Sequence, residues 1–324
     1  MIAVAVGIVA LIAAVYAYGS THKQHSTPEA FEAAQDAVFH AFGASPASRY
    51  TTLRSGVRTH YLEMGAGAPL LAIHGGNSMS ASWARLAQPL SSRSRLIMVD
   101  RPGCGLTDKI NYRGLPFREH AVEFTRDFLD AIGVQKTAIL GNSMGGYFAL
   151  AFALAHPDRV TKLILIGAPP MISEHLDPGH RVLGIRGLNR WIYALRATMA
   201  SFGVSAKPPG FLYAHPEKLT PPEIEAQRAA EALPGAEDSW LTMVEQVTGG
   251  GRYASAYNLR NELAAVRPPT LILIGDRDGI DTTQEVPSTM PQARKVIVRD
   301  AAHIPWVDDT GTCTRLILDF LDTN

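Results

Sequence analysis

The sequence has few cysteines and no net charge. It contains two cysteines, Cys104 and Cys313, which are too few for a disulfide framework and have no partners at metal-ligand spacing. Thirty Lys and Arg residues balance thirty Asp and Glu residues, so no charge excess favours binding to nucleic acid phosphates. The histidines lack the spacing of metal ligands. We therefore expect ordinary thiols, no nucleic acid partner, no metal and no organic cofactor.

The composition is that of a packed globular protein. Hydrophobic residues make up 46% of the chain and charged residues 19%, which excludes a disordered or collagen-like polypeptide. The 324 residues allow one large domain or two small ones. The oligomeric state is left open.

Residues 1–22 form a separate segment. From Ile2 to Tyr18 every residue is apolar or Gly, and the first formally charged side chain is Lys23. This length approaches the ~20 residues that cross a bilayer, and it predicts a single-pass membrane anchor. A cleaved signal peptide is one alternative, because Val15-Tyr16-Ala17 resembles a cleavage site, although the basic region that normally precedes one is missing. A buried helix of a soluble domain is the other alternative. The few nearby charges give only a slight preference for an extracytoplasmic body.

Residues 23–48 are predicted to be a linker and an amphipathic helix. Thr27-Pro28-Glu29 supplies an N-cap, a proline at the first helical position and an early acid. The apolar residues that follow are Phe31, Val38, Phe39 and Phe42. This helix is expected to pack on the domain or to lie on a membrane surface.

From Tyr50 onward, short β-branched and aliphatic runs alternate with segments of helical periodicity. This alternation predicts an open, mostly parallel α/β sheet with helices on both faces. The predicted strands are 50–54, 57–64, 70–73, 96–99, 137–140, 163–166, 270–274 and 295–298. The predicted helices of this part are 117–132, 144–155, 283–290 and 312–321.

The alternation is interrupted once, over residues 169–268. No strand-like run occurs there, whereas 221–233 and 239–247 have helical periodicity. We therefore predict a helical cap inserted before the seventh strand, between two parts of one core, 49–168 and 269–324.

Ser143 is the candidate nucleophile. Gly141-Asn142-Ser143-Met144-Gly145 follows a predicted strand and opens a predicted helix. In this context a G-x-S-x-G sequence forms a sharp turn that exposes the serine hydroxyl at the carboxyl edge of the sheet. Because a serine hydroxyl is a weak nucleophile by itself, a base must be found elsewhere in the chain.

The base and its acid are predicted after the last two strands. Gly275-Asp276-Arg277-Asp278 places two carboxylates just past one buried strand, and His303 follows the next strand. Both positions fall on the same sheet edge as Ser143. His303 would take the serine proton, and a carboxylate would orient its imidazole.

The candidate oxyanion donors are the backbone N–H groups of Gly76 and Met144. Ile73-His74-Gly75-Gly76-Asn77 ends a predicted strand in a tight turn, and Met144 directly follows the nucleophile. His74 is expected to hold this loop by hydrogen bonds rather than to exchange protons.

From Tyr50 to Leu321 the sequence resembles the α/β-hydrolase superfamily, in its capped, serine-nucleophile branch. The similar segments are 74–77, 100–108, 141–146, 275–278 and 302–306. The resemblance implies a triad in the order Ser143, Asp278, His303, with Asp278 preferred to Asp276 because the acid usually stands three residues after the glycine. Epoxide hydrolases of this fold carry an aspartate at the position of Ser143, so that chemistry is disfavoured.

The resemblance leaves the substrate class open. The Gly141 to Gly146 string is similar to that of meta-cleavage-product hydrolases, which break C–C bonds. Those enzymes typically have Trp after the catalytic His, where this chain has Ile304, and a cap arginine, for which Arg186, Arg190 and Arg196 are candidates. We therefore expect hydrolysis of a carboxylic ester of a small to medium hydrophobic substrate, with C–C hydrolysis as the alternative. A non-catalytic ligand-binding protein on the same fold is the alternative from another class.

Overall fold

The computed structural model describes residues 13–21, 23–167, 169–173, 176–202, 212–249, 251–280, 289–290 and 292–323. In this part of the chain eight strands form one sheet, in the order β1-β2-β4-β3-β5-β6-β9-β10. β1 and β2 pair antiparallel, β2 pairs antiparallel with β4, and every further neighbouring pair is parallel. The strands are Ala47–Thr52 (β1), Arg58–Met64 (β2), Pro69–Ile73 (β3), Arg95–Val99 (β4), Thr137–Asn142 (β5), Val160–Ile166 (β6), Thr270–Gly275 (β9) and Ala293–Val298 (β10).

Both faces of the sheet are covered by helices. Alternate residues of a strand point to opposite faces, and here they enter two different hydrophobic clusters: Leu71 and Ile73 of β3 belong to one, Leu70 and Ala72 to the other. The first cluster contains residues of α4 (Phe117–Ala131) and α5 (Met144–Ala155). The second contains residues of α2 (Pro28–Ala41), α3 (Ala84–Ser91), α11 (Pro305–Asp308) and α12 (Thr310–Asp322). The predicted open, mostly parallel sheet with helices on both faces is confirmed.

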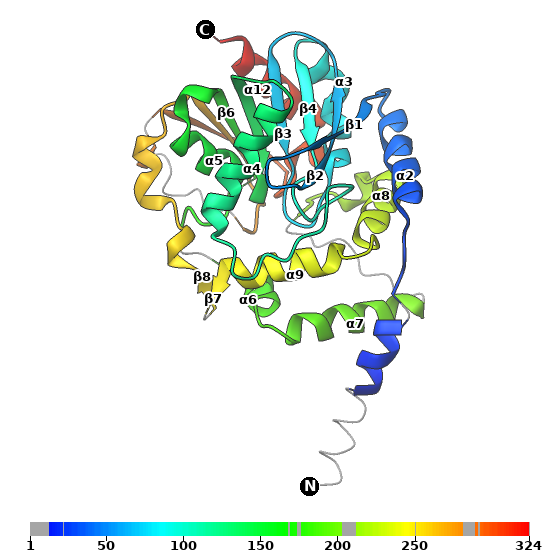
Figure 1. Cartoon of the computed structure of the whole chain (residues 1–324). Helices are drawn as coiled ribbons and strands as arrows, with labels where there is room; N and C mark the ends of the chain where they lie inside the picture. The colour runs from blue at the N-terminus through cyan, green and yellow to red at the C-terminus, as the bar shows by residue number, and fades with distance from the viewer. Residues whose placement is uncertain are drawn as a thin grey trace.

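The chain between β6 and β9 is mainly helical. Its helices are α6 (Pro178–Leu183), α7 (Leu188–Ser201), α8 (Pro221–Glu231) and α9 (Ala236–Val247). Figure 1 shows α9 crossing beneath the sheet, with α7 on the side of α9 that faces away from it. The sequence did not predict the small antiparallel pair β7 (Thr248–Gly249) and β8 (Arg252–Tyr253), nor did it predict α3. The helix predicted over 283–290 lies largely outside the described residues.

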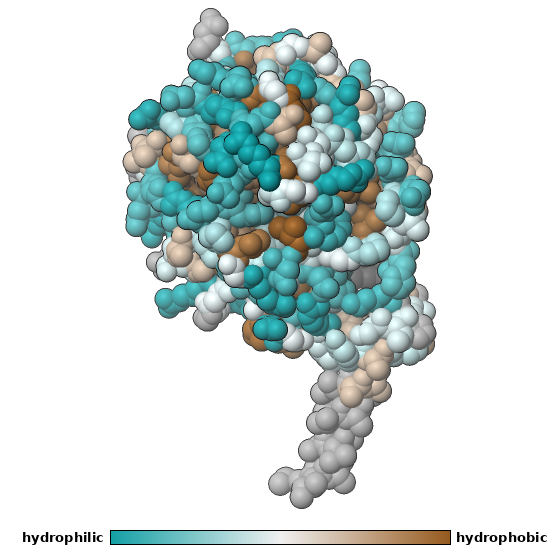
Figure 2. Space-filling view, viewed as in Figure 1, coloured by the Kyte–Doolittle hydropathy of each residue, from teal (hydrophilic) through white to brown (hydrophobic). Residues whose placement is uncertain are grey.

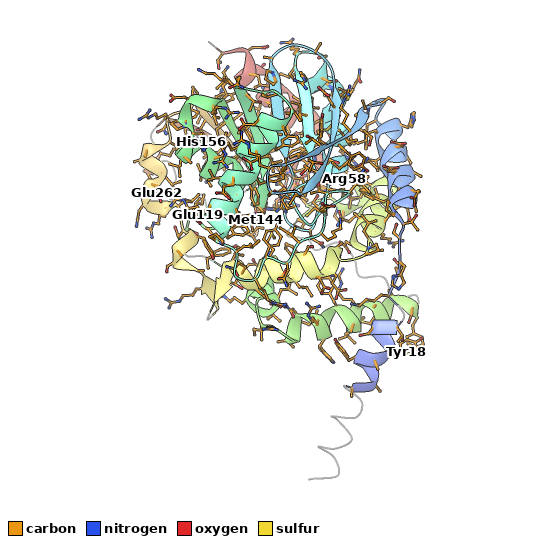
Figure 3. All side chains as sticks on the ribbon, in the orientation of Figure 1. Tyr18, Arg58, Glu119, Met144, His156 and Glu262 are labelled. Carbon is orange, nitrogen blue, oxygen red and sulfur yellow. The ribbon has the colours of Figure 1, made fainter. Side chains whose placement is uncertain are left out.

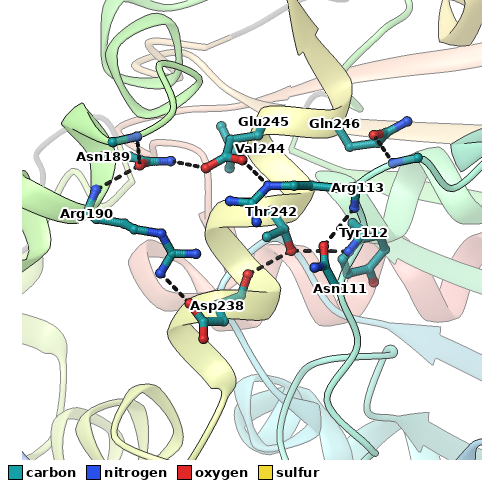
Figure 4. A network of polar contacts seen from close by, with 12 residues as sticks. Asn111, Tyr112, Arg113, Asn189, Arg190, Asp238, Thr242, Val244, Glu245 and Gln246 are labelled. Carbon is teal, nitrogen blue, oxygen red and sulfur yellow. Dashed lines mark hydrogen bonds and ion pairs between the residues drawn. The ribbon is translucent and has the colours of Figure 1, made fainter.

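Polar contacts join this insertion to the core (Figure 4). Arg113, in the loop before α4, donates to Glu245 of α9 at 2.6 Å. Glu245 also accepts from Asn189 of α7 at 2.8 Å, and these contacts lower the pKa of Glu245 although burial opposes the shift. One carboxylate therefore ties α7 and α9 to the core loop. The surface in Figure 2 is largely hydrophilic, with hydrophobic side chains in scattered patches.

The predicted membrane anchor is wrong. None of the helices formed by the described residues has the length and apolar character needed to span a bilayer. Residues 13–21 are helical and lie on α7: Thr198 Oγ1 donates to Val15 O at 3.3 Å, and a Cβ at Gly19 would stand 1.9 Å from Ala194 O. One side of this helix therefore contacts α7, whereas Tyr16 and Tyr18 are exposed. Residues 1–12, where the stretch begins, are outside the described residues.

The amphipathic helix is α2, and it packs on the domain. Thr27 accepts from Ala30 N as the N-cap, as predicted. Phe31, Val38 and Phe39 are at most 1% exposed and belong to the cluster that α3 and α12 share.

Gly275 provides a test of how closely the chain packs at the end of β9. A Cβ there would stand 2.2 Å from Ala301 O and 2.3 Å from Ala302 O, so Gly275→Ala must displace backbone. We expect it to lower the free energy of unfolding by at least ~2 kcal/mol, measured by urea denaturation. Gly249→Ala is the control, since its Cβ meets nothing within 4 Å. A similar loss of stability in both variants would show that backbone contact at Gly275 is not what makes its substitution costly.

Candidate active site

Ser143 lies on a strained turn between β5 and α5. Its φ is 49° and its ψ is −117°, a conformation that few residues other than glycine adopt. A Cβ at Gly145 would stand 2.0 Å from Ile73 O, and one at Gly141 would stand 2.7 Å from Gly145 O. Both glycines of the G-x-S-x-G sequence are therefore required by close backbone contact. Figure 3 labels Met144, the first residue of α5, on the side of the core that faces α9.

His303 and Asp278 form a buried pair. His303 Nδ1 is 2.9 Å from Asp278 Oδ2 and 3.1 Å from Oδ1, and the two side chains are 3% and 0% exposed. The carboxylate accepts the Nδ1 hydrogen, which leaves Nε2 as the ring nitrogen without a contact to Asp278. Asp276 instead accepts from Ala301 N at 3.3 Å. Of the two candidate acids, Asp278 is the one that contacts the imidazole.

The structure does not show a hydrogen bond between His303 and Ser143. His303 Nε2 is buried and has no hydrogen-bond partner among the residues described. The spacing around it is tight, since a Cβ at Gly167 would lie 3.1 Å from His303 Cε1. Catalytic hydrogen bonds are often long before substrate binds, so this geometry leaves a serine-to-histidine proton transfer open.

A buried arginine holds the turn that contains Gly76. Arg101 follows β4 and donates through Nε to His74 O at 3.0 Å and through Nη2 to Gly75 O at 2.7 Å. His74 donates from Nδ1 to Gly75 O at 2.9 Å and accepts at Nε2 from Arg101 N at 3.0 Å. Burial, with the Arg101 charge beside it, lowers the pKa of His74 to about 3. His74 is thus uncharged at neutral pH and holds the turn through hydrogen bonds.

Ser143, Gly76 and Met144 line one pocket beneath the sheet. Gly76 is packed against α9, because a Cβ there would stand 2.7 Å from the Trp240 ring. The other described residues that line the pocket are Pro170, Asp177, His180, Trp240, Met243, Val244, Val247, Tyr253 and Ile280. Most of the residues that line this pocket with Ser143 therefore come from the insertion.

None of the three arginines considered as substrate anchors is among the described residues that line this pocket. Arg190 pairs with Asp238, and Arg196 stacks on Tyr193 at 5.1 Å. Nor do three or more His, Cys, Asp or Glu side chains cluster as a metal site within the described ranges. Both cysteines are free, and burial raises the pKa of Cys313 to about 12.

Sequence reasoning missed Asp177, His180 and the clamp formed by Arg101. Asp177-Pro178-Gly179-His180 carries a signal that was available: an N-cap acid, a proline at the first helical position and a histidine three residues after the acid. The role of Arg101 depends on a contact between two strand ends, which the sequence pattern does not reveal.

Comparison with known proteins identifies the family. Residues 68–310, more than half of the chain, match the family model described as alpha/beta hydrolase fold. The chain therefore belongs to the α/β-hydrolase superfamily, as the sequence motifs predicted.

Two relatives and one solved structure illustrate the likeness. A 2-hydroxy-6-oxononadienedioate/2-hydroxy-6-oxononatrienedioate hydrolase of Cupriavidus pinatubonensis is 28% identical over 291 residues, covering 85% of this chain and 95% of that protein. A 2-hydroxymuconate semialdehyde hydrolase of a Pseudomonas species is 27% identical, covering 86% and 95%. The epoxide hydrolase CorEH superimposes with a TM-score of 0.72 at 18% identity, covering 85% and 98%, which shows the shared fold.

Two buried histidines predict how stability depends on pH. Burial, aided by the Arg101 charge, lowers the pKa of His120 to about 4 and that of His74 to about 3. An unfolded histidine titrates near ~6.5, so below that pH the unfolded chain binds more protons than the folded one. The free energy of unfolding should therefore fall as the pH drops from ~6.5 toward ~4.

His120→Phe should make this decline shallower, because it removes one of the two imidazoles whose pKa is lowered by folding. A phenyl ring suits the site, since His120 contacts the rings of Tyr112 and Phe148. Urea denaturation at several pH values measures the slope. His40→Gln, at an exposed position of α2, should leave it unchanged. If the free energy of unfolding falls equally steeply with pH in wild type and His120→Phe, His120 does not contribute to the pH dependence.

Proposed function

We propose that this protein is a serine hydrolase that cleaves a C–C bond next to a ketone, in substrates of the meta-cleavage-product type. The main support is the similarity to relatives named as hydrolases of 2-hydroxy-6-oxo dienoic acids, which extends over nearly their whole length. The Gly141 to Gly146 sequence and the buried Asp278–His303 pair agree with this interpretation. The expectation of ester hydrolysis takes second place.

In this mechanism Ser143 attacks the substrate ketone. Its proton passes to His303 Nε2, and its Oγ bonds to the carbonyl carbon. The carbonyl oxygen takes a negative charge, which the N–H groups of Gly76 and Met144 bind. The tetrahedral centre then expels the neighbouring carbon with its electron pair, and that carbon takes the proton from His303. Water hydrolyses the acyl-serine by the same route, releasing a carboxylic acid.

Asp278 acts through His303. The carboxylate fixes the Nδ1–H tautomer and stabilises the imidazolium that forms when the serine loses its proton. Arg101 acts through the oxyanion turn: by binding the carbonyls of His74 and Gly75 on one side, it fixes the orientation of the peptide groups on the other.

We further propose that the insertion, residues 169–268, is a cap that selects the substrate. α9 contributes Trp240, Met243, Val244 and Val247 to the pocket, and the polar contacts of Glu245 hold this helix on the core. The wall presented to the substrate is mostly apolar, which suits a hydrophobic chain beside the scissile bond.

Hydrolysis of a carboxylic ester is the second candidate, and specific observations favour it. Ile304 stands where C–C hydrolases of this type have tryptophan, and no Lys or Arg is found among the described pocket residues. An ester needs no stabilised carbon leaving group, so the same nucleophile and oxyanion donors serve it without further groups.

Substitutions of the proposed triad test the mechanism. Ser143→Ala and His303→Ala should each lower kcat for p-nitrophenyl acetate by about 10⁴-fold or more while the circular dichroism spectrum stays native. Asp278→Asn should lower it by a similar order, because the imidazole loses its tautomer. Asp276→Asn is the matched control and should retain most activity, since Asp276 does not contact His303.

A fluorophosphonate probe should label wild-type protein and leave Ser143→Ala unlabelled. If well-folded wild-type protein stays unlabelled, the proposal that Ser143 is a nucleophile is refuted, and a non-catalytic binding protein is favoured.

A substrate panel separates the two candidate reactions. We expect kcat/KM for a 2-hydroxy-6-oxo dienoate to exceed that for p-nitrophenyl esters of acyl chains of increasing length by at least about tenfold, because relatives act on such ketones. The loss of dienoate absorbance and the release of p-nitrophenolate measure the rates. Turnover of esters alone would establish ester hydrolysis instead.

A further inference from the structure

The loop that carries His303 contacts the insertion as well as the core. The 212–218 segment of the insertion lies between α7 and α8 in the chain. None of its residues is among the described residues that line the pocket. Leu212 O accepts from Ile304 N at 2.9 Å. The insertion therefore binds the residue that directly follows the proposed catalytic base.

Asp308, at the end of α11, makes a second connection between the two. This residue is 5% exposed, and its carboxylate accepts three backbone N–H groups. Oδ2 accepts from Ala302 at 2.8 Å and from Ala214 at 3.1 Å. Oδ1 accepts from His215 at 2.8 Å. Because Ala302 directly precedes His303, one buried carboxylate joins the histidine loop to the 212–218 segment.

Charged side chains add to this connection at the surface. His215 Nε2 is 2.8 Å from Asp300 Oδ2, and Lys218 donates to Asp308 O. Exposed ion pairs contribute little to stability by themselves. The buried carboxylate of Asp308 is therefore the main link between the insertion and the loop.

The core holds the beginning of the same loop. Ala301 O accepts from Arg277 N at 2.9 Å, and Ala301 N donates to Asp276 Oδ1 at 3.3 Å. A Cβ at Gly275 would stand 2.2 Å from Ala301 O, so the backbone is crowded there as well. The residues after β9 thus fix the loop as far as Ala301, whereas the two amides on either side of His303 are bound by the carboxylate and by the insertion.

The position of this loop matters for proton transfer. His303 Nε2 has no hydrogen-bond partner among the described residues, so the distance to Ser143 must shorten before a proton passes. A misplacement of about 1 Å can lower a rate by about a hundredfold. Asp278 sets the orientation of the imidazole ring, and the backbone of the loop sets where the ring stands.

We propose that the 212–218 segment, bound to Asp308 and Ile304, positions His303 for proton transfer from Ser143. Asp308 is the positioning residue of this connection. The inference rests on the proposed hydrolase function and gives the insertion a role besides substrate selection. An insertion that moves off the core would leave Ser143 without an aligned base, so the nucleophile is fully activated only when the insertion is docked.

Two substitutions break the connection from opposite sides. Asp308→Ala removes the acceptor of three N–H groups. Tyr213→Ala removes a side chain through which the 212–218 segment packs on the core, and Tyr213 is not among the described pocket residues. Asp309→Ala is the matched control. Its carboxylate also accepts a backbone N–H, from Thr312 at 2.9 Å, but it caps α12.

The first measurement is the rate constant for labelling by a fluorophosphonate, which reports the activation of Ser143. We expect it to fall by about tenfold or more in Asp308→Ala and in Tyr213→Ala, because the base is misplaced. kcat for p-nitrophenyl acetate should fall equally, with KM changed by less than about twofold. Asp309→Ala should keep the wild-type rate constants although losing the cap lowers its stability. The double variant Asp308→Ala/Tyr213→Ala should be no slower than the slower single variant.

The second measurement is hydrogen exchange of the Ala302 and Ile304 amides, followed by NMR. It reports the connection without any reaction, since these amides are protected by Asp308 and Leu212. Both amides should exchange faster in Asp308→Ala and in Tyr213→Ala than in wild type, and at the wild-type rate in the control.

A wild-type labelling rate in either folded variant overturns the proposal, and so does unchanged amide exchange. If the circular dichroism spectrum shows that Asp308→Ala does not fold, Tyr213→Ala decides by the same two measurements. A wild type that is never labelled, but whose Ala302 and Ile304 amides exchange faster in the variants, refutes the hydrolase function and supports the positioning of the loop by the insertion. The two proposals therefore fail in distinguishable ways.

Discussion

Close backbone contact at the carboxyl edge of the sheet is the constraint on which the site depends. At Gly145, Gly167 and Gly275, a Cβ would stand between 2.0 and 2.5 Å from a carbonyl oxygen of another segment. These contacts hold the turn at Ser143 against the end of β3, and the β6 and β9 ends against the loop that carries His303. Because carbonyl groups of the backbone yield far less readily than side chains, the relative positions of Ser143, Asp278 and His303 are set by the chain itself.

The core was predictable because its signals are local. The strand, turn and helix around Ser143 follow one another in sequence, and α5 begins and ends at the predicted residues. That a carboxylate after β9 would lie near His303 followed from parallel strands ending at a common edge, whereas the choice of Asp278 over Asp276 came from the family resemblance. The prediction of a membrane anchor from the apolar stretch before Lys23 was wrong, because hydropathy does not identify what an apolar helix contacts. Part of this stretch lies on α7. The Asp177–His180 pair required a side-chain rotamer and a docked helix, neither of which periodicity specifies.

Arg101 shows how a buried charge organises the turn that follows β3. A guanidinium that is 0% exposed is tolerated only when its donors are satisfied, and here backbone carbonyls of His74 and Gly75 satisfy two of them. These hydrogen bonds restrain the rotation of the same peptide groups. His74 strengthens this arrangement because its low pKa keeps Nε2 free to accept from Arg101 N. The hydrogen bonds that satisfy the Arg101 guanidinium therefore also fix the orientation of the peptide group that carries Gly76 N–H.

The His303 and His180 imidazoles each pair with a carboxylate, but they differ in the part of the fold that holds them. His303 lies in the rigid core, where Asp278 is fully buried and the backbone is crowded. His180 lies on α6, a helix of six residues whose N-cap is the same Asp177 that orients the ring. A short helix gains little stability from its own hydrogen bonds, so the carboxylate that positions the imidazole also stabilises the turn that carries it. The orientation of the His180 ring is thereby coupled to the folding of α6, whereas the orientation of His303 depends on the crowded backbone around Gly275.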